Sequence, residues 1–336
     1  MCRRPDFGLG GLSGKALGVV VARLTDSPLP DLLVANDGEA NFFFRSSEDS
    51  TNGHRTFEET AVRSGLAFDR DGRAQACMGI AVDDVNGDSR LDFFITNFYE
   101  ESNTLYVQKP GVLFADETRE AGLRNPSFRM LGFGTQFLDV DLDGLPDLVV
   151  ANGHVDDFSY EGKAYRMPPQ CFRNAGGGQF LELTPGRRDS YFSGEYLGRG
   201  LARIDWNRDG REDFVVSHLD APAALAANES SQCGNSLIIR LIGVQCSRDA
   251  VGTNVTVNSA GSRRTRQLTA GDGYQASNER ILVFGLADAA EAEEVFIQWP
   301  SGAEQSLNHL AAGFEYRVIE GRTAAAAIPL ESAIRN

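Results

Sequence analysis

Short apolar runs alternate with turn-forming residues along most of the chain, and runs of four residues recur directly after acidic loops. Each run consists of apolar, β-branched or small residues and follows an Asp, and two of the three are followed by Asn, which is typical of β-strands. The three runs are Phe93–Thr96, Leu148–Ala151 and Phe214–Ser217. The loops before them span residues 84–92, 139–147 and 205–213. We therefore expect each acidic loop to be a turn between two strands.

The loops are parts of a longer repeat. Their last Asp residues are separated by 147 − 92 = 55 and 213 − 147 = 66 residues. A glycine stands five residues before the first Asp of each loop, at Gly79, Gly134 and Gly200. The same spacing identifies an earlier copy, with Gly18 at its start and Asp31 at the end of its loop. Four copies of this length, each with room for a four-stranded sheet, predict the blades of a β-propeller.

The repeat pattern ends near residue 230, and longer apolar runs without acidic loops follow it. These runs are 237–241, 251–257, 281–284 and 295–299. We predict an all-β chain with propeller repeats over residues 14–230 and a small β-sandwich-like domain over residues 235–321. The Ala-rich remainder, residues 322–336, is predicted to be a loose tail.

The acidic loops present side-chain oxygens at alternate positions. They read DVNGDSRLD, DVDLDGLPD and DWNRDGRED, with Asp or Asn at positions 1, 3, 5 and 9. Calcium prefers about six to eight hard oxygen ligands, and a backbone carbonyl at position 7 can supply one of them. We therefore predict about three Ca²⁺ ions, one in each loop. The predicted metal ligands are Asp84, Asn86, Asp88, Arg90, Asp92, Asp139, Asp141, Asp143, Leu145, Asp147, Asp205, Asn207, Asp209, Arg211 and Asp213.

Other interpretations of the loops fit less well. An EF-hand needs flanking helices and a Glu at position 12, where these loops have an apolar residue inside a predicted strand. Magnesium prefers fewer carboxylates and keeps several waters. Polar turns without metal explain one loop more easily than three in the same register. The earliest copy has Arg23, Thr25 and Ser27 at positions 1, 3 and 5, so we expect a blade there without a metal.

The formal net charge of −15 argues against binding to nucleic acid or to anionic membrane surfaces. No run of about 18 apolar residues is present, so no membrane-spanning helix is predicted. The first residues do not contain the apolar segment of a signal peptide. The five cysteines lack zinc-binding spacing; Cys233 and Cys246 could form a disulfide, but isolated thiols are the favoured interpretation.

The pattern D-x-[DN]-x-D-G-x-x-D between strands resembles the FG-GAP/VCBS repeats of integrin-α-like propellers. The end of the chain resembles the ASPIC/UnbV domain, which is named after cartilage acidic proteins and a bacterial homologue. The segments that carry this second resemblance are Leu241–Gly243, Arg248–Gly252, Ala270–Tyr274, Phe284–Leu286 and Trp299–Gly302. Together they imply a secreted or surface-exposed, calcium-loaded propeller, which in relatives is usually a ring of seven blades.

Four repeats are fewer than the seven blades that the resemblance implies. Three explanations stay open: a truncated sequence, a divergent beginning, or an assembly that closes in another way. An open arc of blades would leave sheet edges exposed, which is unfavourable for a folded monomer.

Two hypotheses about function remain from the sequence. The first is an interaction module that binds a protein or carbohydrate through loops on one propeller face. The second is a calcium-dependent enzyme, lyase-like or hydrolase-like, with a pocket at the propeller mouth. No catalytic motif is recognised and no catalytic residue is predicted, which favours the first. A metal site between His154 and His218, or acid catalysis by Glu100 and Glu101 or by the pair at 156–157, is a weaker alternative.

Overall fold

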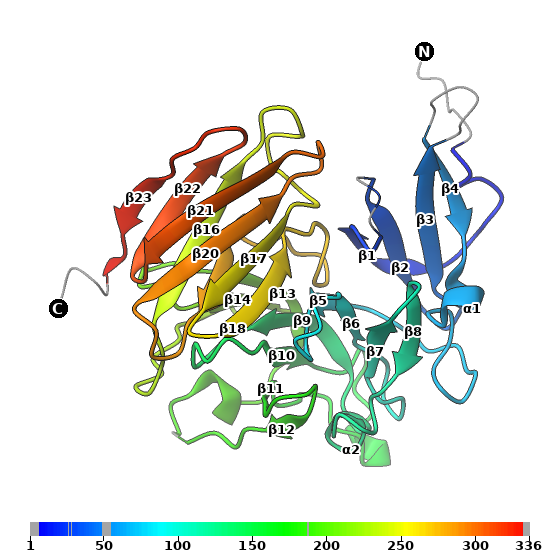
Figure 1. The fold of residues 1–336 in the computed structure, drawn as a ribbon. Coiled ribbons are helices and arrows are strands. Elements are labelled where there is room, and N and C mark those ends of the chain that lie inside the picture. Colours follow the sequence, from blue (N-terminus) through cyan, green and yellow to red (C-terminus); the bar gives the residue numbers. More distant parts are fainter. Residues whose placement is uncertain (1–6, 26, 28, 49–54, 187, 332–336) are drawn as a thin grey trace.

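Four small antiparallel sheets follow one another along the first two thirds of the chain (Figure 1). The computed structural model describes residues 7–25, 27, 29–48, 55–186 and 188–331. The strands of the first two sheets are β1 (Ala16–Ala22), β2 (Asp31–Asn36), β3 (Phe42–Glu48) and β4 (Arg55–Glu59), then β5 (Ile80–Asp83), β6 (Asp92–Ile95), β7 (Thr104–Lys109) and β8 (Leu113–Asp116). Those of the next two are β9 (Gly132–Leu138), β10 (Asp147–Asn152), β11 (Gln170–Asn174) and β12 (Phe180–Glu182), then β13 (Gly198–Ile204), β14 (Asp213–His218) and β15 (Ala224–Ala226).

Each predicted loop joins the first strand of a sheet to its second strand, as the sequence pattern indicated. The second strands β2, β6, β10 and β14 all begin at the last Asp of a loop. Within the described residues, helix is confined to single turns: α1 (Ala61–Ser64), α2 (Arg124–Ser127), and the 3₁₀ turns η1 (Ser159–Glu161) and η2 (Tyr191–Ser193). The prediction of an all-β fold built from repeated sheets is therefore confirmed.

The apolar runs are continuous because neighbouring sheets cover both faces of a strand. Side chains alternate between the two faces of β6. Phe93 lies in the core shared with the first sheet, where it joins Val20. Phe94 lies in the core shared with the third sheet, where it joins Phe137. Both residues are fully buried, which explains three consecutive apolar residues in so short a strand.

The recurrent glycines lie where the first strands of neighbouring sheets pass close to one another. A Cβ atom added at Gly18 would lie 2.5 Å from the carbonyl oxygen of Met78. At Gly79 it would lie 2.2 Å from the carbonyl oxygen of Phe133. At Gly134 it would lie 2.4 Å from that of Arg199. Only glycine permits this separation, so the spacing seen in the sequence reflects packing between sheets.

The C-terminal domain is a sandwich of two four-stranded sheets, which Figure 1 shows beside the first four sheets. Its apolar core takes side chains from both sheets, including Ile239 and Phe284 of one and Val257 and Ile297 of the other. The strands are β16 (Ser236–Ile242), β17 (Asn254–Ser259), β18 (Ser262–Gln267), β19 (Leu282–Gly285), β20 (Glu291–Gln298), β21 (Glu304–Ala311), β22 (Phe314–Ile319) and β23 (Ala326–Pro329).

The prediction of a loose tail over residues 322–336 was wrong for part of that range. Residues 326–329 form β23, which pairs antiparallel with β22 along Phe314–Arg317. Leu330 is buried in a small core with Leu142 and Ile238. The Ala-rich composition hid this strand, because backbone pairing and one buried leucine hold it in place. Residues 332–336 lie outside the described part of the chain.

Residues 268–281, here called the central segment, join the C-terminal domain to the first strands of all four sheets. The backbone of Ala270 pairs with Val21 in β1, and that of Gly273 pairs with Ile80 in β5. Asn278 donates to the side chain of Gln136 in β9 (3.0 Å) and accepts from the backbone N–H of Arg203 in β13 (2.9 Å). The described residues thus contain four repeat sheets rather than seven blades, and the C-terminal domain covers the inner edge that these four sheets share.

Candidate metal sites and a polar pocket

The last Asp of each loop joins the loop to the third strand of its own sheet or, for Asp213, to Asn228 just after that strand. Asp92 accepts one hydrogen bond from the N–H of Val85, at loop position 2, and another from that of Gln108 in β7 (3.0 and 2.8 Å). Asp147 makes the same pair of bonds with Val140 and Asn174 (3.0 and 2.7 Å). These aspartates therefore fix the turn through backbone donors as well as presenting oxygens to the loop.

The first Asp of each loop accepts hydrogen bonds from the backbone N–H groups on the far side of the turn. Asp139 accepts from Asp143 (3.0 Å) and Gly144 (2.8 Å). Asp205 accepts in the same way from Asp209 (3.1 Å) and Gly210 (3.0 Å). This wrapping turns positions 1, 3 and 5 inward, as calcium coordination by alternate residues requires.

The second loop gathers carboxylates most closely. One oxygen from each of Asp139, Asp141 and Asp147 lies within 4.8 Å of the others. Oδ1 of Asp141 is buried and has no hydrogen-bond partner among the described residues. A buried carboxylate oxygen without a donor is unfavourable unless a cation or water satisfies it. The donor set and this orphaned oxygen both fit a calcium ion.

Two positions of each loop adopt left-handed backbone conformations. Position 4 has φ values of 79°, 56° and 56° at Gly87, Leu142 and Arg208. Position 6 is Ser89, Gly144 or Gly210, and it is also left-handed in all three loops. For leucine and arginine this conformation is strained by about 1 kcal/mol or more. The three loops therefore share one backbone shape although only two of them have glycine at position 6.

Burial raises the pKa of the first and last Asp of each acidic loop, whereas the neighbouring Arg211 lowers the pKa of Asp209. Burial raises the pKa of Asp92 to about 8 and that of Asp147 to about 7. It raises the pKa of Asp84 and of Asp205 to about 6 each, and neighbouring aspartates add to the shift. The pKa of Asp139 rises well above its ordinary value for the same reason. The shifts come mainly from burial, and neighbouring aspartates, whose charge a bound cation would neutralise, contribute less.

Arginines lie beside the position-5 carboxylates. Arg90 pairs with Asp88 (2.6 Å), and Arg211 pairs with Asp209. The loop motif assigns only the backbone carbonyls of these arginines to the metal. It does not indicate that their side chains form ion pairs with the aspartates. Trp206 in the third loop is half-exposed, so the indole is not buried over the loop.

The earliest repeat keeps the loop's anchoring bonds and lacks its carboxylates. Asp31 accepts from the N–H of Leu24 (3.3 Å) and from that of Ser46 (2.8 Å), as the last Asp does in the other loops. Arg23 instead donates to the backbone carbonyl of Ser27 (3.1 Å). The sheet can therefore form with hydrogen bonds alone at this loop.

The two histidines that the sequence singled out lie in separate environments. His154 is buried against the rings of Phe98 and Phe158. His218 lies 3.0 Å from the hydroxyl of Tyr191 and contacts the carbonyl of Pro222. Among the described residues, the one cluster of three metal-binding side chains is in the second acidic loop. Cys233 and Cys246 are free thiols.

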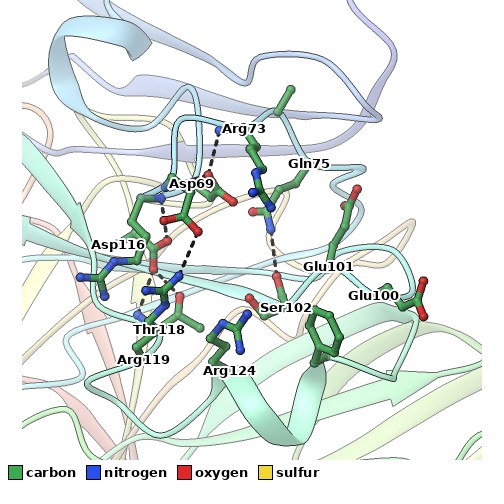
Figure 2. Close-up of a pocket in the computed structure, with 14 residues that line it drawn as sticks. Asp69, Arg73, Gln75, Glu100, Glu101, Ser102, Asp116, Thr118, Arg119 and Arg124 are labelled. Carbon is green, nitrogen blue, oxygen red and sulfur yellow. Dashed lines mark hydrogen bonds and ion pairs between the residues drawn. The ribbon is translucent and has the colours of Figure 1, made fainter.

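A small polar pocket of 170 Å³ lies beside the first two sheets, as Figure 2 shows. Glu100 and Glu101, the acid pair noted in the sequence, are among its lining residues. Arg73 and Arg124 lie on opposite sides of it, and neither guanidinium forms an ion pair with a described residue. Arg124 instead stacks on the ring of Phe128 at 5.3 Å.

Two protein-family models match parts of the chain. The model of the FG-GAP-like repeat matches residues 139–216, which include the second and third acidic loops. The model "ASPIC and UnbV" matches residues 243–325, which form most of the C-terminal sandwich. The chain matches both models, in that order. The resemblance seen in the sequence is therefore confirmed.

Cartilage acidic protein 1 is similar to most of the chain. The human protein is 25% identical over 307 residues, which cover 90% of this chain and 43% of that protein. The mouse protein is 25% identical over 289 residues, 85% of this chain and 42% of its own length. The chain thus spans less than half the length of these relatives.

Among solved structures, the exotype rhamnogalacturonan lyase YesX is 10% identical to this chain. The alignment covers 87% of this chain and 64% of that one, and its TM-score is 0.25. A TM-score this low carries no argument about fold or activity. No helix in the described residues is long and apolar enough to cross a membrane.

Proposed function

We propose that this chain is a calcium-stabilised interaction module of the extracellular space, and that it binds a protein or carbohydrate ligand. The second acidic loop carries the calcium assignment, because it brings three carboxylates within 4.8 Å and leaves Oδ1 of Asp141 buried without a partner. In this proposal, the side chains at positions 1, 3, 5 and 9 and the backbone carbonyl at position 7 hold one ion in each of the three loops.

Similarity to cartilage acidic protein 1 supports the extracellular location. The acidic surface, with a net charge of −15, suits a medium that contains millimolar calcium. Disulfides are typical of oxidising extracellular environments, and Cys233 and Cys246 are free thiols. The extracellular location therefore needs a separate test.

The pocket of Figure 2 is the place where we expect a ligand. Its 170 Å³ is below the range of about 300–1,000 Å³ that is common for drug-sized ligands, so it suits one sugar ring or one peptide side chain. The ring of Phe128, on which Arg124 stacks, adds an apolar wall. The guanidinium groups of Arg73 and Arg124 offer hydrogen bonds to a carboxylate or sulfate group. The lining also includes five carboxylates, which would accept hydrogen bonds from hydroxyl groups: Asp69, Asp71, Glu100, Glu101 and Asp116. A saccharide with one acidic group for the two arginines and hydroxyl groups for these carboxylates fits the lining.

Calorimetric titration with CaCl₂ tests the metal assignment. The chain, stripped with EDTA, is expected to bind about three ions. Asp143→Ala should weaken one site and leave two, because each loop supplies its own ligands. Asp157→Ala, a change to an exposed aspartate outside the loops, serves as the matched control. An absence of calcium binding by the unmodified chain would overturn the assignment.

An array of neutral and acidic oligosaccharides tests the pocket. Binding of an acidic saccharide should be lost in the double variant Arg73→Ala/Arg124→Ala. The control Arg263→Ala/Arg322→Ala removes two exposed arginines from the C-terminal domain and makes the same change in net charge. Equal loss in both variants would indicate attraction by charge alone, and retention in both would place the ligand elsewhere.

A further inference from the structure

All three acidic loops contact the C-terminal domain through hydrogen bonds. In the first loop, the hydroxyl of Ser89 lies 3.2 Å from that of Thr265. In the third, the carboxylate of Glu279 accepts from the N–H of Asp205 (3.2 Å), a predicted calcium ligand. The second loop accepts three bonds of this kind, from Gly234 to the carbonyl of Asp141, from Ala287 to that of Leu142 and from Arg264 to that of Gly144 (2.9, 2.9 and 2.8 Å).

The strained position 4 of the second and third loops bears the side chain that enters this interface. Leu142, with φ of 56°, is buried with Ile238 and Val283 of the C-terminal domain. Arg208, also with φ of 56°, forms an ion pair with Glu315, a buried carboxylate of β22. The left-handed turn that surrounds the predicted ion is therefore the same turn that shapes the docking surface.

The C-terminal domain also packs directly on a predicted ligand. A Cβ atom added at Gly285 would lie 2.1 Å from Oδ2 of Asp139 and 2.6 Å from the carbonyl carbon of Leu142. Asp139 is fully buried. The position of this carboxylate thus depends both on its own loop and on the backbone of β19.

We infer that calcium binding and docking of the C-terminal domain are coupled, so that the ions order one side of the interface between the domains. This inference rests on the proposed calcium binding. Calcium would hold the left-handed turns in the shape that the C-terminal domain recognises. By linkage, docking must raise calcium affinity by the same factor by which calcium favours docking.

Hydrogen exchange of the full chain, with CaCl₂ or with EDTA, tests the coupling. The N–H groups of Gly234, Ala287 and Glu331 bond to carbonyls of the second and third loops, so they report on docking. Their exchange should accelerate at least tenfold in EDTA. Amides of β17, which pair only within the sandwich, should keep their protection and thereby exclude global unfolding.

Gly285→Ala tests the reciprocal effect without altering any predicted ligand. Its steric contact with Asp139 should weaken calcium binding at one of three sites about tenfold in a calorimetric titration. Gly186→Ala, where an added Cβ meets no atom within 4 Å, is the matched control and should bind like the unmodified chain.

The outcomes separate the inference from the proposed function. If three ions bind but interface amides exchange equally with and without calcium, and Gly285→Ala binds normally, the coupling is wrong and the calcium assignment stands. If the unmodified chain binds no calcium, the proposed function fails first, and the coupling fails with it. Accelerated exchange together with weakened binding supports both.

Discussion

At the scale of single residues, the aspartates of the loops divide into two roles. The last Asp anchors the turn to its sheet through two backbone donors, and it does so even in the first repeat, where Asp31 has no neighbouring carboxylates at positions 1, 3 and 5. In this first repeat, positions 1, 3 and 5 have no Asp or Asn, so the metal-binding pattern is lost while the anchoring Asp is kept. The sequence motif thus combines a structural anchor with a separate set of ligands.

Asp31→Ala should destabilise the chain whether or not calcium is present. The change leaves the N–H groups of Leu24 and Ser46 without their acceptor beside a fully buried site, which should cost about 2–4 kcal/mol for two such donors. Urea unfolding in CaCl₂ and in EDTA provides the measurement. Asp31→Asn, which keeps one acceptor, should lose roughly half as much. A loss seen only with calcium would show that this loop does bind metal.

At the scale of strands, the spacing of glycines records how the sheets pack. Gly18, Gly79 and Gly134 each face the backbone of the next sheet's first strand, or of the residues leading into it, at a distance that excludes a side chain. Gly200 has a different neighbour, because the carbonyl of Tyr274 in the central segment lies 3.1 Å from a Cβ built there. The fourth sheet therefore meets the C-terminal domain where the others meet a further sheet.

Gly79→Ala should lower the free energy of unfolding by about 1–3 kcal/mol or more, the range of overpacking effects in well-packed cores. The added methyl would lie 2.2 Å from the carbonyl oxygen of Phe133, and backbone on both sides leaves little freedom to adjust. Gly200→Ala, with its nearest atom at 3.1 Å, should cost less. Chemical denaturation of both variants checks this order, and an equal or reversed cost would contradict the packing argument.

The strands and loops could be predicted from sequence because their signals are local. Asp92 and the apolar run after it are adjacent in the chain, and the same arrangement recurs in every copy. Strands β15 and β23 could not be predicted, because Ala224–Ala226 and Ala326–Pro329 have little intrinsic preference for strand and form by pairing with a neighbour. The arginine partners of Asp88 and Asp209 were likewise missed, since the loop motif draws attention to oxygens alone.

At the scale of the whole molecule, the packing of the C-terminal domain on the four sheets depends on contacts that sequence spacing cannot show. Val21 and Ala270 are 249 residues apart and pair through their backbones. Arg266, buried between the domains, lies 3.5 Å from the carboxylate of Asp83 and 3.7 Å from that of Glu212. The central segment, which lies within the region matched by the model "ASPIC and UnbV", thus contacts the first strands of all four sheets.

Removal of calcium should lower the thermal stability of the complete chain. An ion bound only to the native state at 100 times its Kd stabilises that state by about 2.7 kcal/mol, so three independent sites would contribute roughly 8 kcal/mol. With about 2–4 °C for each kcal/mol in a large domain, the midpoint of unfolding should fall by more than about 10 °C. Differential scanning calorimetry in CaCl₂ and in EDTA measures this change.

The same experiment discriminates between metals and between architectures. Magnesium should restore little of the lost stability, because these loops offer more carboxylates and a more flexible geometry than magnesium prefers. If the interface between the domains depends on calcium, one unfolding transition in CaCl₂ should separate into two in EDTA, since each domain has a core of its own. An unchanged midpoint of unfolding in EDTA would contradict the calcium assignment. A lower midpoint with a single transition in EDTA would support calcium binding and would locate its stabilising effect within the four sheets, not at the interface between the domains.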